Sequence, residues 1–307
     1  MEITTMGPAE IRELISMRDA VDAVREGFLA LHRGEFEMPT RTVLRDGGFL
    51  VMSVHHRPSS SAMIKTLSLN FDRSPAIVGT VTWSEFGHTD HLVADAMELT
   101  RIRTGAVSGV ATDLMAPPEA ATCTVIGAGG QAADQARAVQ AVRPLSRLHI
   151  VSRNSDKAEA LAARLREELP IADVTSGTDV EKGVRDVDVV CCATTSTTPL
   201  FPADAIAAHT HVNAIGAFRP TMRELPDELL TDSVVVIDEL EAILEEAGDV
   251  LHALDAGAVT RDRLVELGPA LADGIGPRTG RTVFKSVGVA LQDWAIARIL
   301  ADRALRR

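Results

Sequence analysis

The fold is decided by one short segment, Thr122-Cys123-Thr124-Val125-Ile126-Gly127-Ala128-Gly129-Gly130-Gln131-Ala132. An apolar strand predicted over 122–127 leads into a turn of the form G-x-G-x-x-A, and a helix predicted over 131–142 follows directly. The first glycine permits the tight turn, the second lets the backbone approach a pyrophosphate, and Ala132 keeps the helix close to the strand. Free N–H groups at the helix start favour phosphate. The segment predicts a dinucleotide site at Gly127, Ala128, Gly129, Gly130 and Gln131; the alternative is a glycine-rich turn without a ligand.

Strands and helices alternate after this loop. Further strands are predicted over 148–152, 189–193, 211–216 and 233–238, and a helix over 156–169. These strands are apolar with little alternation, which is typical of parallel strands covered on both faces. We therefore expect an α/β protein in which residues 116–286, after the boundary Ala116-Pro117-Pro118, form a Rossmann-type doubly wound parallel sheet.

The first third of the chain has a different pattern. A helix is predicted between the capping residue Ser16 and the closing Gly34. Short strands are predicted over 41–44, 49–54, 63–69 and 77–83, with turns between them, and a helix over 99–115. Residues 1–115 are thus expected to form an α+β domain whose sheet consists largely of neighbouring strands. A C-terminal amphipathic helix is expected from about residue 287.

The second predicted strand of the dinucleotide unit ends in a way that bears on the cofactor. An Asp or Glu there would bind the 2′-hydroxyl of NAD. The sequence instead has Ser152-Arg153-Asn154, with Lys157 one turn later. A hydroxyl with a guanidinium suits a 2′-phosphate. We expect NADP(H) to be preferred and NAD(H) to be possible; the alternative is that Arg153 and Lys157 are ordinary surface residues.

Composition excludes several classes of function. The chain has 307 residues, with 31 Lys and Arg against 43 Asp and Glu, so its net charge is −12. This balance disfavours nucleic acid and anionic membranes as partners. No apolar run approaches ~18 residues, so no membrane span is expected. The three cysteines have neither disulfide nor metal-ligand spacing, and the start lacks the features of a secretory signal. We expect a cytoplasmic protein without a metal site.

Beyond these features, the chain resembles the ornithine cyclodeaminase/mu-crystallin family nearly from end to end. The resemblance is carried by eight short motifs at 38–41, 63–65, 99–106, 126–132, 211–217, 223–225, 245–249 and 284–288. It implies that residues 1–115, completed by the C-terminal helix 287–307, form a substrate and dimerisation domain. A homodimer is expected on the same ground.

The resemblance also implies the substrate site. The family's carboxylate-binding residues fall on Arg41, Lys65 and Arg103. An Arg can grip a carboxylate with two parallel hydrogen bonds, and a Lys can also give up a proton when its pKa is depressed. Lys65 is therefore the expected catalytic residue, with water as the alternative proton donor. Without the resemblance, we would expect all three to be surface residues, because charged side chains are mostly exposed.

Two departures from the family pattern bear on the reaction. Phe218 stands where ornithine cyclodeaminases carry an Asp that handles the substrate amine, and Ala76 stands where the family has a Thr. Both resemble the mu-crystallin-like members, which reduce cyclic ketimines, and Phe218 suits an apolar substrate ring. We expect an NAD(P)H-dependent reductase of a small α-imino acid, such as pyrroline- or piperideine-2-carboxylate, or an amino-acid dehydrogenase. The alternatives are an ornithine or lysine cyclodeaminase with bound NAD, and a non-catalytic mu-crystallin-like binding protein.

Other candidate residues lie close to predicted strand ends. Thr194 follows the strand 189–193, where it could reach the ribose or nicotinamide. By resemblance, cofactor contacts are also expected from Ile215, Gly216, Ser286 and Gly288. His55 and His56 are adjacent, so a strand would point them to opposite faces. At most one of them would then face the site, where it could act as a proton donor; we expect a polar loop instead.

Overall fold

The computed structural model describes residues 2–70, 72–277 and 280–305, which form two compact units. The first unit contains residues 1–107 and 289–307, and the second contains residues 108–288. The chain passes from one to the other inside helix α3 (Ala96–Met115). The division therefore lies between Val107 and Ser108, in the middle of a helix, eight residues before the boundary at residue 116 that the sequence suggested.

The first unit is built on a seven-stranded sheet with the order β1-β7-β6-β5-β4-β2, and β3 pairs with β4. Its strands are β1 (Ile3–Met6), β2 (Phe36–Glu37), β3 (Thr42–Leu44), β4 (Phe49–His56), β5 (Ser61–Leu69), β6 (Ile77–Glu85) and β7 (His91–Asp95). Its helices besides the start of α3 are α1 (Pro8–Leu14), α2 (Met17–His32) and α11 (Ala290–Ala304). Strands β3 to β6 were predicted. Strands β1 and β2 were not, because they are short and pair with strands distant in the sequence, and the five-residue β7, which forms a hairpin with β6, was not recognised either.

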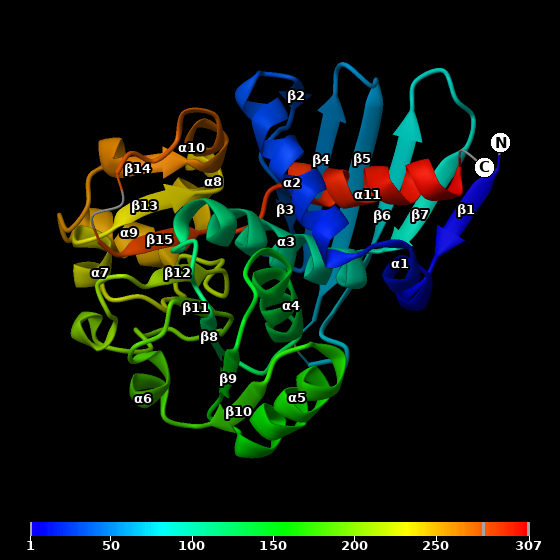
Figure 1. Ribbon diagram of the computed structural model, residues 1–307. Helices are drawn as coiled ribbons and strands as arrows, with labels where there is room; N and C mark the ends of the chain where they lie inside the picture. The colour runs from blue at the N-terminus through cyan, green and yellow to red at the C-terminus, as the bar shows by residue number, and fades with distance from the viewer. Residues whose placement is uncertain (1, 71, 278–279, 306–307) are drawn as a thin grey trace. The chain divides into compact units, whose positions relative to one another are not determined.

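One face of this sheet is buried beneath helices and the other is exposed. Residues directly opposite on neighbouring strands share a face. Met52, Lys65 and Val81 form one such row and are all buried, whereas Ile64, one residue away, is 45 % exposed. Helix α11 packs on β4, β5 and β6 and on α2, and Figure 1 shows it crossing the strands. The alternation of side chains along each strand thus determines which of them pack against α11.

The second unit contains an eight-stranded sheet with the order β10-β9-β8-β11-β12-β15-β13-β14, in which every pairing is parallel. Its strands are β8 (Thr122–Ile126), β9 (Arg147–Val151), β10 (Asp173–Gly177), β11 (Val189–Cys192), β12 (His211–Ala214), β13 (Val234–Ile237), β14 (Leu264–Glu266) and β15 (Thr282–Lys285). The order reverses at β8, because β9 and β10 extend to one side and β11 lies on the other. The Rossmann-type prediction is confirmed.

Helices cover both faces of this sheet, as Figure 1 shows. The helices are α4 (Ala132–Val142), α5 (Ser155–Glu168), α6 (Val180–Val184), α7 (Asp227–Thr231), α8 (Leu240–Glu246), α9 (Gly248–Asp255) and α10 (Leu267–Asp273), with short 3-10 turns at Ala203–Ala205 and Arg261–Arg263. Val125 and Ile150 join the core formed with α4 and α5. On the opposite face Thr124 Oγ1 donates to Gly183 O in α6 at 2.6 Å. Double coverage explains why these strands are apolar throughout.

The C-terminal helix α11 ends at Ala304, and residues 306–307, which the sequence assigned to it, lie outside the described residues. None of the helices in the described part of the chain is long and apolar enough to cross a membrane.

Candidate functional site: a buried cation cluster and a loop edge

Lys65 is the centre of a cluster of charges in the first unit. It lies on the covered face of β5 and is 1 % exposed. Its ammonium donates to Asp293 Oδ1 at 2.9 Å and to Thr100 Oγ1 at 2.6 Å. Thr100 can accept because its own hydroxyl donates to Ala96 O. Burial lowers the pKa of Lys65 to about 8; the Asp293 carboxylate opposes this shift and the charges of Arg103 and Arg41 add to it.

Arg103 reaches the same cluster from α3. Its Nη1 donates to Gln292 Oε1 at 2.6 Å, and its Nε lies 3.3 Å from Asp293 Oδ1. Arg41 is half-buried just before β3, close enough for its charge to lower the pKa of Lys65. The structure thus brings Lys65 and Arg103 together and places the charge of Arg41 near them.

Sequence reasoning missed three members of this cluster: Thr100, Gln292 and Asp293. Asp293 has no exposed surface, although it lies on a helix that looks amphipathic in sequence. Its partner Lys65 is 228 positions away along the chain. The one available signal was electrostatic, since a buried lysine needs a nearby anion. Nothing local shows which acidic residue supplies it.

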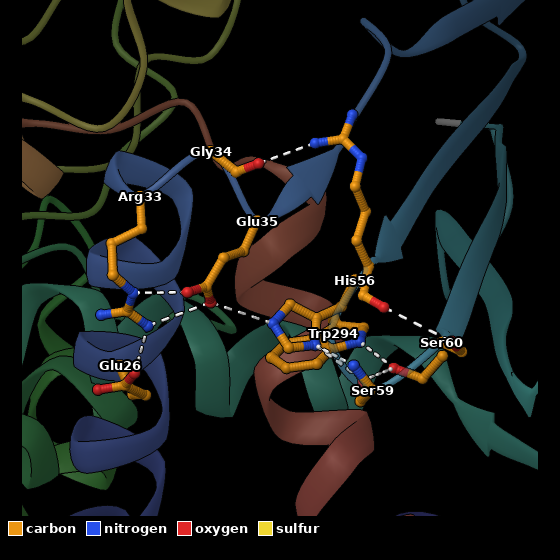
Figure 2. Close-up of polar contacts among 10 residues, drawn as sticks. Glu26, Arg33, Gly34, Glu35, His56, Ser59, Ser60 and Trp294 are labelled. Carbon is orange, nitrogen blue, oxygen red and sulfur yellow. Dashed lines mark hydrogen bonds and ion pairs between the residues drawn. The ribbon is translucent and has the colours of Figure 1, made fainter.

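His55 and His56 lie on β4, so the prediction of a polar loop was wrong. Figure 2 shows His56 between Glu35 and Ser59, with its ring against Trp294. His56 Nδ1 is 2.7 Å from Ser59 Oγ, its Nε2 is 3.5 Å from Glu35 Oε2, and the two ring centroids are 4.6 Å apart. Burial lowers the pKa of His56. These contacts assign His56 a packing role at the end of the strand.

The second unit carries the glycine loop between β8 and α4. Gly127 has φ +114°, and a Cβ there would lie 2.4 Å from Ala193 O, so glycine is required on two grounds. A Cβ at Gly129 would meet no atom within 4 Å. Gln131, which precedes α4, provides no side-chain cap, and its buried Oε1 has no hydrogen-bond partner among the described residues. Open space beside uncapped helix N–H groups fits a dinucleotide pyrophosphate.

The other expected cofactor residues lie at the same edge of the sheet. Ile126 pairs with Val151 and Cys192, and Ala214 pairs with Cys192 and Lys285, so the strands end level with one another. The segments that follow these strand ends contain the loop 127–131, Ser152 to Lys157, Thr194, Ile215 and Gly216, and Ser286 to Gly288. Ligands of open α/β sheets bind outside this edge, where the strand order reverses. Here that point lies between β8 and β11.

The segment after β9 is arranged as a helix cap with two exposed cations. Asn154 Oδ1 accepts from Lys157 N at 2.8 Å and so caps α5. Ser152 Oγ accepts from Asn154 N at 3.3 Å. The side chains of Arg153 and Lys157 are exposed. Asn154 therefore has a structural role, and Arg153 and Lys157 are the residues of this segment that can reach a ligand.

A buried carboxylate that the sequence left without a role joins two of the loops. Glu224 Oε1 accepts from Thr194 N and Oγ1 at 2.7 and 2.8 Å. Its Oε2 accepts from Gly216 N and Ala217 N at 2.8 and 3.0 Å. Burial raises the pKa of Glu224, which the nearby Lys285 ammonium opposes. The Thr194 hydroxyl thus donates its proton to Glu224 and retains only acceptor capacity for a cofactor.

Further buried pairs support the same edge. Lys285 Nζ donates to Asp249 Oδ2 at 2.8 Å and to Ala217 O at 2.6 Å, and Asp249 Oδ1 accepts from Glu224 N. In the segment after β15, Asp238 Oδ2 accepts from Ser286 Oγ, Val287 N and Gly288 N at 2.8 to 2.9 Å. The Ser286 hydroxyl is therefore committed to Asp238.

Phe218, the expected substrate contact, lies in the second unit after β12. It is half-buried, and the guanidinium of Arg219 lies 5.6 Å from its ring centroid. Among the described residues we found no group of three His, Cys, Asp or Glu side chains that could hold a metal ion.

Comparison with known proteins places this geometry in context. The profile of the ornithine cyclodeaminase/mu-crystallin family matches residues 3–307. The chain is 36 % identical over 240 residues to Delta(1)-pyrroline-2-carboxylate reductase of Bacillus cereus, covering 75 % of this chain and 72 % of that protein. It is 36 % identical over 301 residues to L-lysine cyclodeaminase of Streptomyces rapamycinicus, covering 91 % and 84 %. The structure of Thermococcus litoralis Delta(1)-pyrroline-2-carboxylate reductase in complex with NADH and L-proline matches with a TM-score of 0.92 at 26 % identity, covering 100 % and 98 % of the two chains.

Proposed function

Since this chain belongs to the ornithine cyclodeaminase/mu-crystallin family, we propose that it is an NAD(P)H-dependent reductase of a small α-imino acid. The observation that carries the proposal is the buried cluster of Lys65 and Arg103 beside Arg41. Three cations around one carboxylate form a site for a small organic anion. The reductases of Bacillus cereus and Thermococcus litoralis support pyrroline-2-carboxylate as the first substrate to test.

Each of the three cations has a distinct part in the proposed reaction. Arg103 and Arg41 bind and orient the substrate carboxylate through charge-assisted hydrogen bonds. Lys65, with a pKa of about 8, is mostly protonated at neutral pH and donates its proton to the imine nitrogen. Thr100 and Asp293 hold the ammonium in place. Bound NAD(P)H supplies the hydride for the imine carbon.

Residues of the second unit would hold the cofactor. The loop from Gly127 to Gln131 takes the pyrophosphate, with support from the N–H groups at the start of α4. Thr194, Ile215, Gly216 and Gly288 lie along the same edge, toward the ribose and nicotinamide. Ser286 contributes by its place in the segment after β15, because its hydroxyl is bound to Asp238.

NADP(H) is the cofactor we favour, with NAD(H) also accepted. The support is Arg153 and Lys157, which are exposed after β9, where an NAD-specific site carries a carboxylate. The Thermococcus litoralis relative holds NADH, so the preference needs a direct test. We expect R153A to lower kcat/KM for NADPH about tenfold while leaving that for NADH unchanged, which steady-state kinetics with both cofactors measures.

The second candidate function is cyclodeamination of lysine or ornithine with NAD retained. It is favoured by the 36 % identity to the lysine cyclodeaminase of Streptomyces rapamycinicus. It is opposed by Phe218, because a phenyl ring can neither pair with an ammonium nor act as a base. A mu-crystallin-like binding protein without chemistry is the third candidate, and the protonated, buried Lys65 opposes it.

One set of assays separates the three candidates. Oxidation of NADPH and NADH is followed with pyrroline-2-carboxylate, piperideine-2-carboxylate and pyruvate plus ammonia, and ammonia release is followed with ornithine and lysine. We expect oxidation with at least one cyclic imine. Ammonia release without net cofactor turnover would overturn the reductase proposal, and tight cofactor binding without either reaction would favour the binding protein.

Assembly and location belong to the same proposal. We expect a homodimer formed through the first unit, and a cytoplasmic location.

A further inference from the structure

Two buried polar atoms at the start of α11 have no hydrogen-bond partner within the described part of the chain. They are Asp293 Oδ2 and Gln292 Nε2, and neither residue has exposed surface. The remaining polar atoms of both side chains are engaged: Asp293 Oδ1 by Lys65 and Arg103, and Gln292 Oε1 by Arg103. Buried groups without partners are costly and rare, so this pair calls for a ligand.

The chemistry of the two atoms restricts the kind of ligand that can bind to them. Asp293 Oδ2 is an anionic acceptor, and Gln292 Nε2 is a donor. Once Lys65 has protonated its nitrogen, an α-imino acid offers an N–H to the first and a carboxylate to the second, and so does its amino acid product. A 2-oxo acid offers only the carboxylate. The pair therefore matches the zwitterion and not a carboxylate alone.

We propose that Asp293 determines substrate specificity by accepting a hydrogen bond from the substrate's N–H, while Gln292 donates to the substrate carboxylate. This inference rests on the reductase function proposed above and extends it to the class of substrate. Imino and amino acids that carry an N–H next to the carboxylate are selected over 2-oxo acids of the same shape.

The charges around the pair are consistent with this role. The groups that face Lys65 are Asp293 from α11, Arg103 from α3 and Arg41 from the segment before β3. Three cations and one anion give the cluster an excess positive charge, which favours an incoming carboxylate. Asp293 reduces that excess. Among the described residues of the cluster, it is the only anion that could accept a hydrogen bond from a substrate N–H.

A pair of probes tests the proposal without turnover. L-proline and cyclopentanecarboxylate share the ring and the carboxylate, and only proline has an N–H. Calorimetry on the full chain with NAD⁺ present should show proline binding about tenfold or more tighter, as expected for a hydrogen bond between charged groups. A wild-type ratio near one would overturn the proposal.

D293N should remove the discrimination. With both probes measured at pH 6, where Lys65 keeps its proton, proline binding is expected to weaken about tenfold. Cyclopentanecarboxylate should bind as well as before or better, because a negative charge has left the cluster. Misfolding cannot produce this opposite pair of effects. Equal loss of both probes, or an unchanged ratio, would overturn the proposal.

Should D293N fail to fold, D293E keeps the charge and moves the carboxylate by one methylene. Its proline binding should fall, with cyclopentanecarboxylate binding retained, and an unaltered ratio would again contradict the role of Asp293. The matched control is D19N. Asp19 pairs with Arg303 at an exposed site, so this variant should bind both probes as the wild type does.

Q292E should weaken both probes equally, whereas D293N should change their ratio. Its side chain keeps an oxygen for Arg103 and replaces the Nε2 donor with a second oxygen. Both probes should weaken by the same factor, about tenfold, with their ratio preserved. If neither weakens, Gln292 does not contact the carboxylate.

Failure of this inference is distinguishable from failure of the reductase function. Selective proline binding that D293N abolishes, in a chain that reduces no cyclic imine, would overturn the reductase and retain Asp293 as a specificity residue. If the chain reduces a cyclic imine but its D293N variant still prefers proline, the reductase function stands and the role of Asp293 is overturned.

Discussion

At the scale of single residues, the first unit holds a proton where water does not reach. Lys65 is 1 % exposed, yet Asp293 and Thr100 keep its ammonium charged at neutral pH. Burial penalises the charged form and lowers the Lys65 pKa to about 8, and the adjacent carboxylate opposes that shift. The balance gives a lysine that can release a proton within the physiological range.

The first prediction is a pH profile. Because the Lys65 pKa is about 8, its ammonium is present below that pH and is lost above it. We expect kcat/KM for imine reduction to be level near neutral pH and to fall about tenfold per unit above pH 8. In D293N this limb should move to lower pH, since the Asp293 carboxylate raises the Lys65 pKa. A profile that stays level to pH 9.5 would exclude Lys65 as the proton donor.

The second prediction concerns Glu224. In E224Q the amide nitrogen of the new side chain would face donors that now reach a carboxylate oxygen, such as Gly216 N and Ala217 N. We expect the free energy of unfolding to fall by about 1–3 kcal/mol or more, and NAD(P)H to bind more weakly. Urea denaturation and cofactor titration measure the two effects. The exposed Glu245 provides a control, and E245Q should change neither.

At the scale of elements, the loop between β8 and α4 contains two glycines with different tasks. Gly127 serves the fold, since its positive φ and the 2.4 Å approach to Ala193 O exclude a side chain. Gly129 has open space beside it, so the fold does not require a glycine there. The proposed pyrophosphate would account for a glycine at this position.

The third prediction follows from this contrast. G127A should lose at least about 1–3 kcal/mol of stability through backbone strain. G129A should stay within about 0.5 kcal/mol of the wild type and bind NAD(P)H about tenfold more weakly or worse. Thermal unfolding with and without cofactor checks both variants. Normal cofactor affinity in G129A would argue against a pyrophosphate at this loop.

The helices and strands also show which parts of the fold could be predicted from the sequence. The strand, turn and helix around Gly127 were predicted to within about a residue, because every signal they use is local. Strands β1 and β7 pair with each other across most of the first unit, and such pairing leaves no local mark. The same limit hid Asp293 and Glu224, whose burial depends on partners that packing alone brings near. Only the family resemblance indicated that Lys65 and Arg103 belong to one site.

At the scale of the whole molecule, the exposed face of the first sheet has no cover among the described residues. Leu44, Phe49 and Ile64 share that face by their pairing on β3, β4 and β5, and they are 50 %, 43 % and 45 % exposed. Neighbouring large apolar side chains on an open sheet face are characteristic of an interface.

The fourth prediction tests the expected homodimer on this face. The double variant F49E/I64E places two carboxylates among these apolar residues, which a second copy of the chain could not bury. Sedimentation should show a dimer for the wild type and a monomer for the variant, with secondary structure retained. The double variant E241Q/E245Q, which changes exposed residues of α8, should remain a dimer. A wild-type chain that sediments as a monomer would contradict the proposal directly.

Helix α11 has a consequence for biosynthesis. It covers strands β4 to β6 and supplies the anion for Lys65, yet it follows the whole second unit in the sequence. On the ribosome, residues 108–288 emerge as an uninterrupted stretch and can fold as soon as they are made. The first unit, although translated first, must wait with an uncovered sheet and an uncompensated lysine until residues 289–305 appear. The nascent chain therefore completes its units in the reverse of the order in which they begin, and the waiting sheet is where a chaperone would be needed.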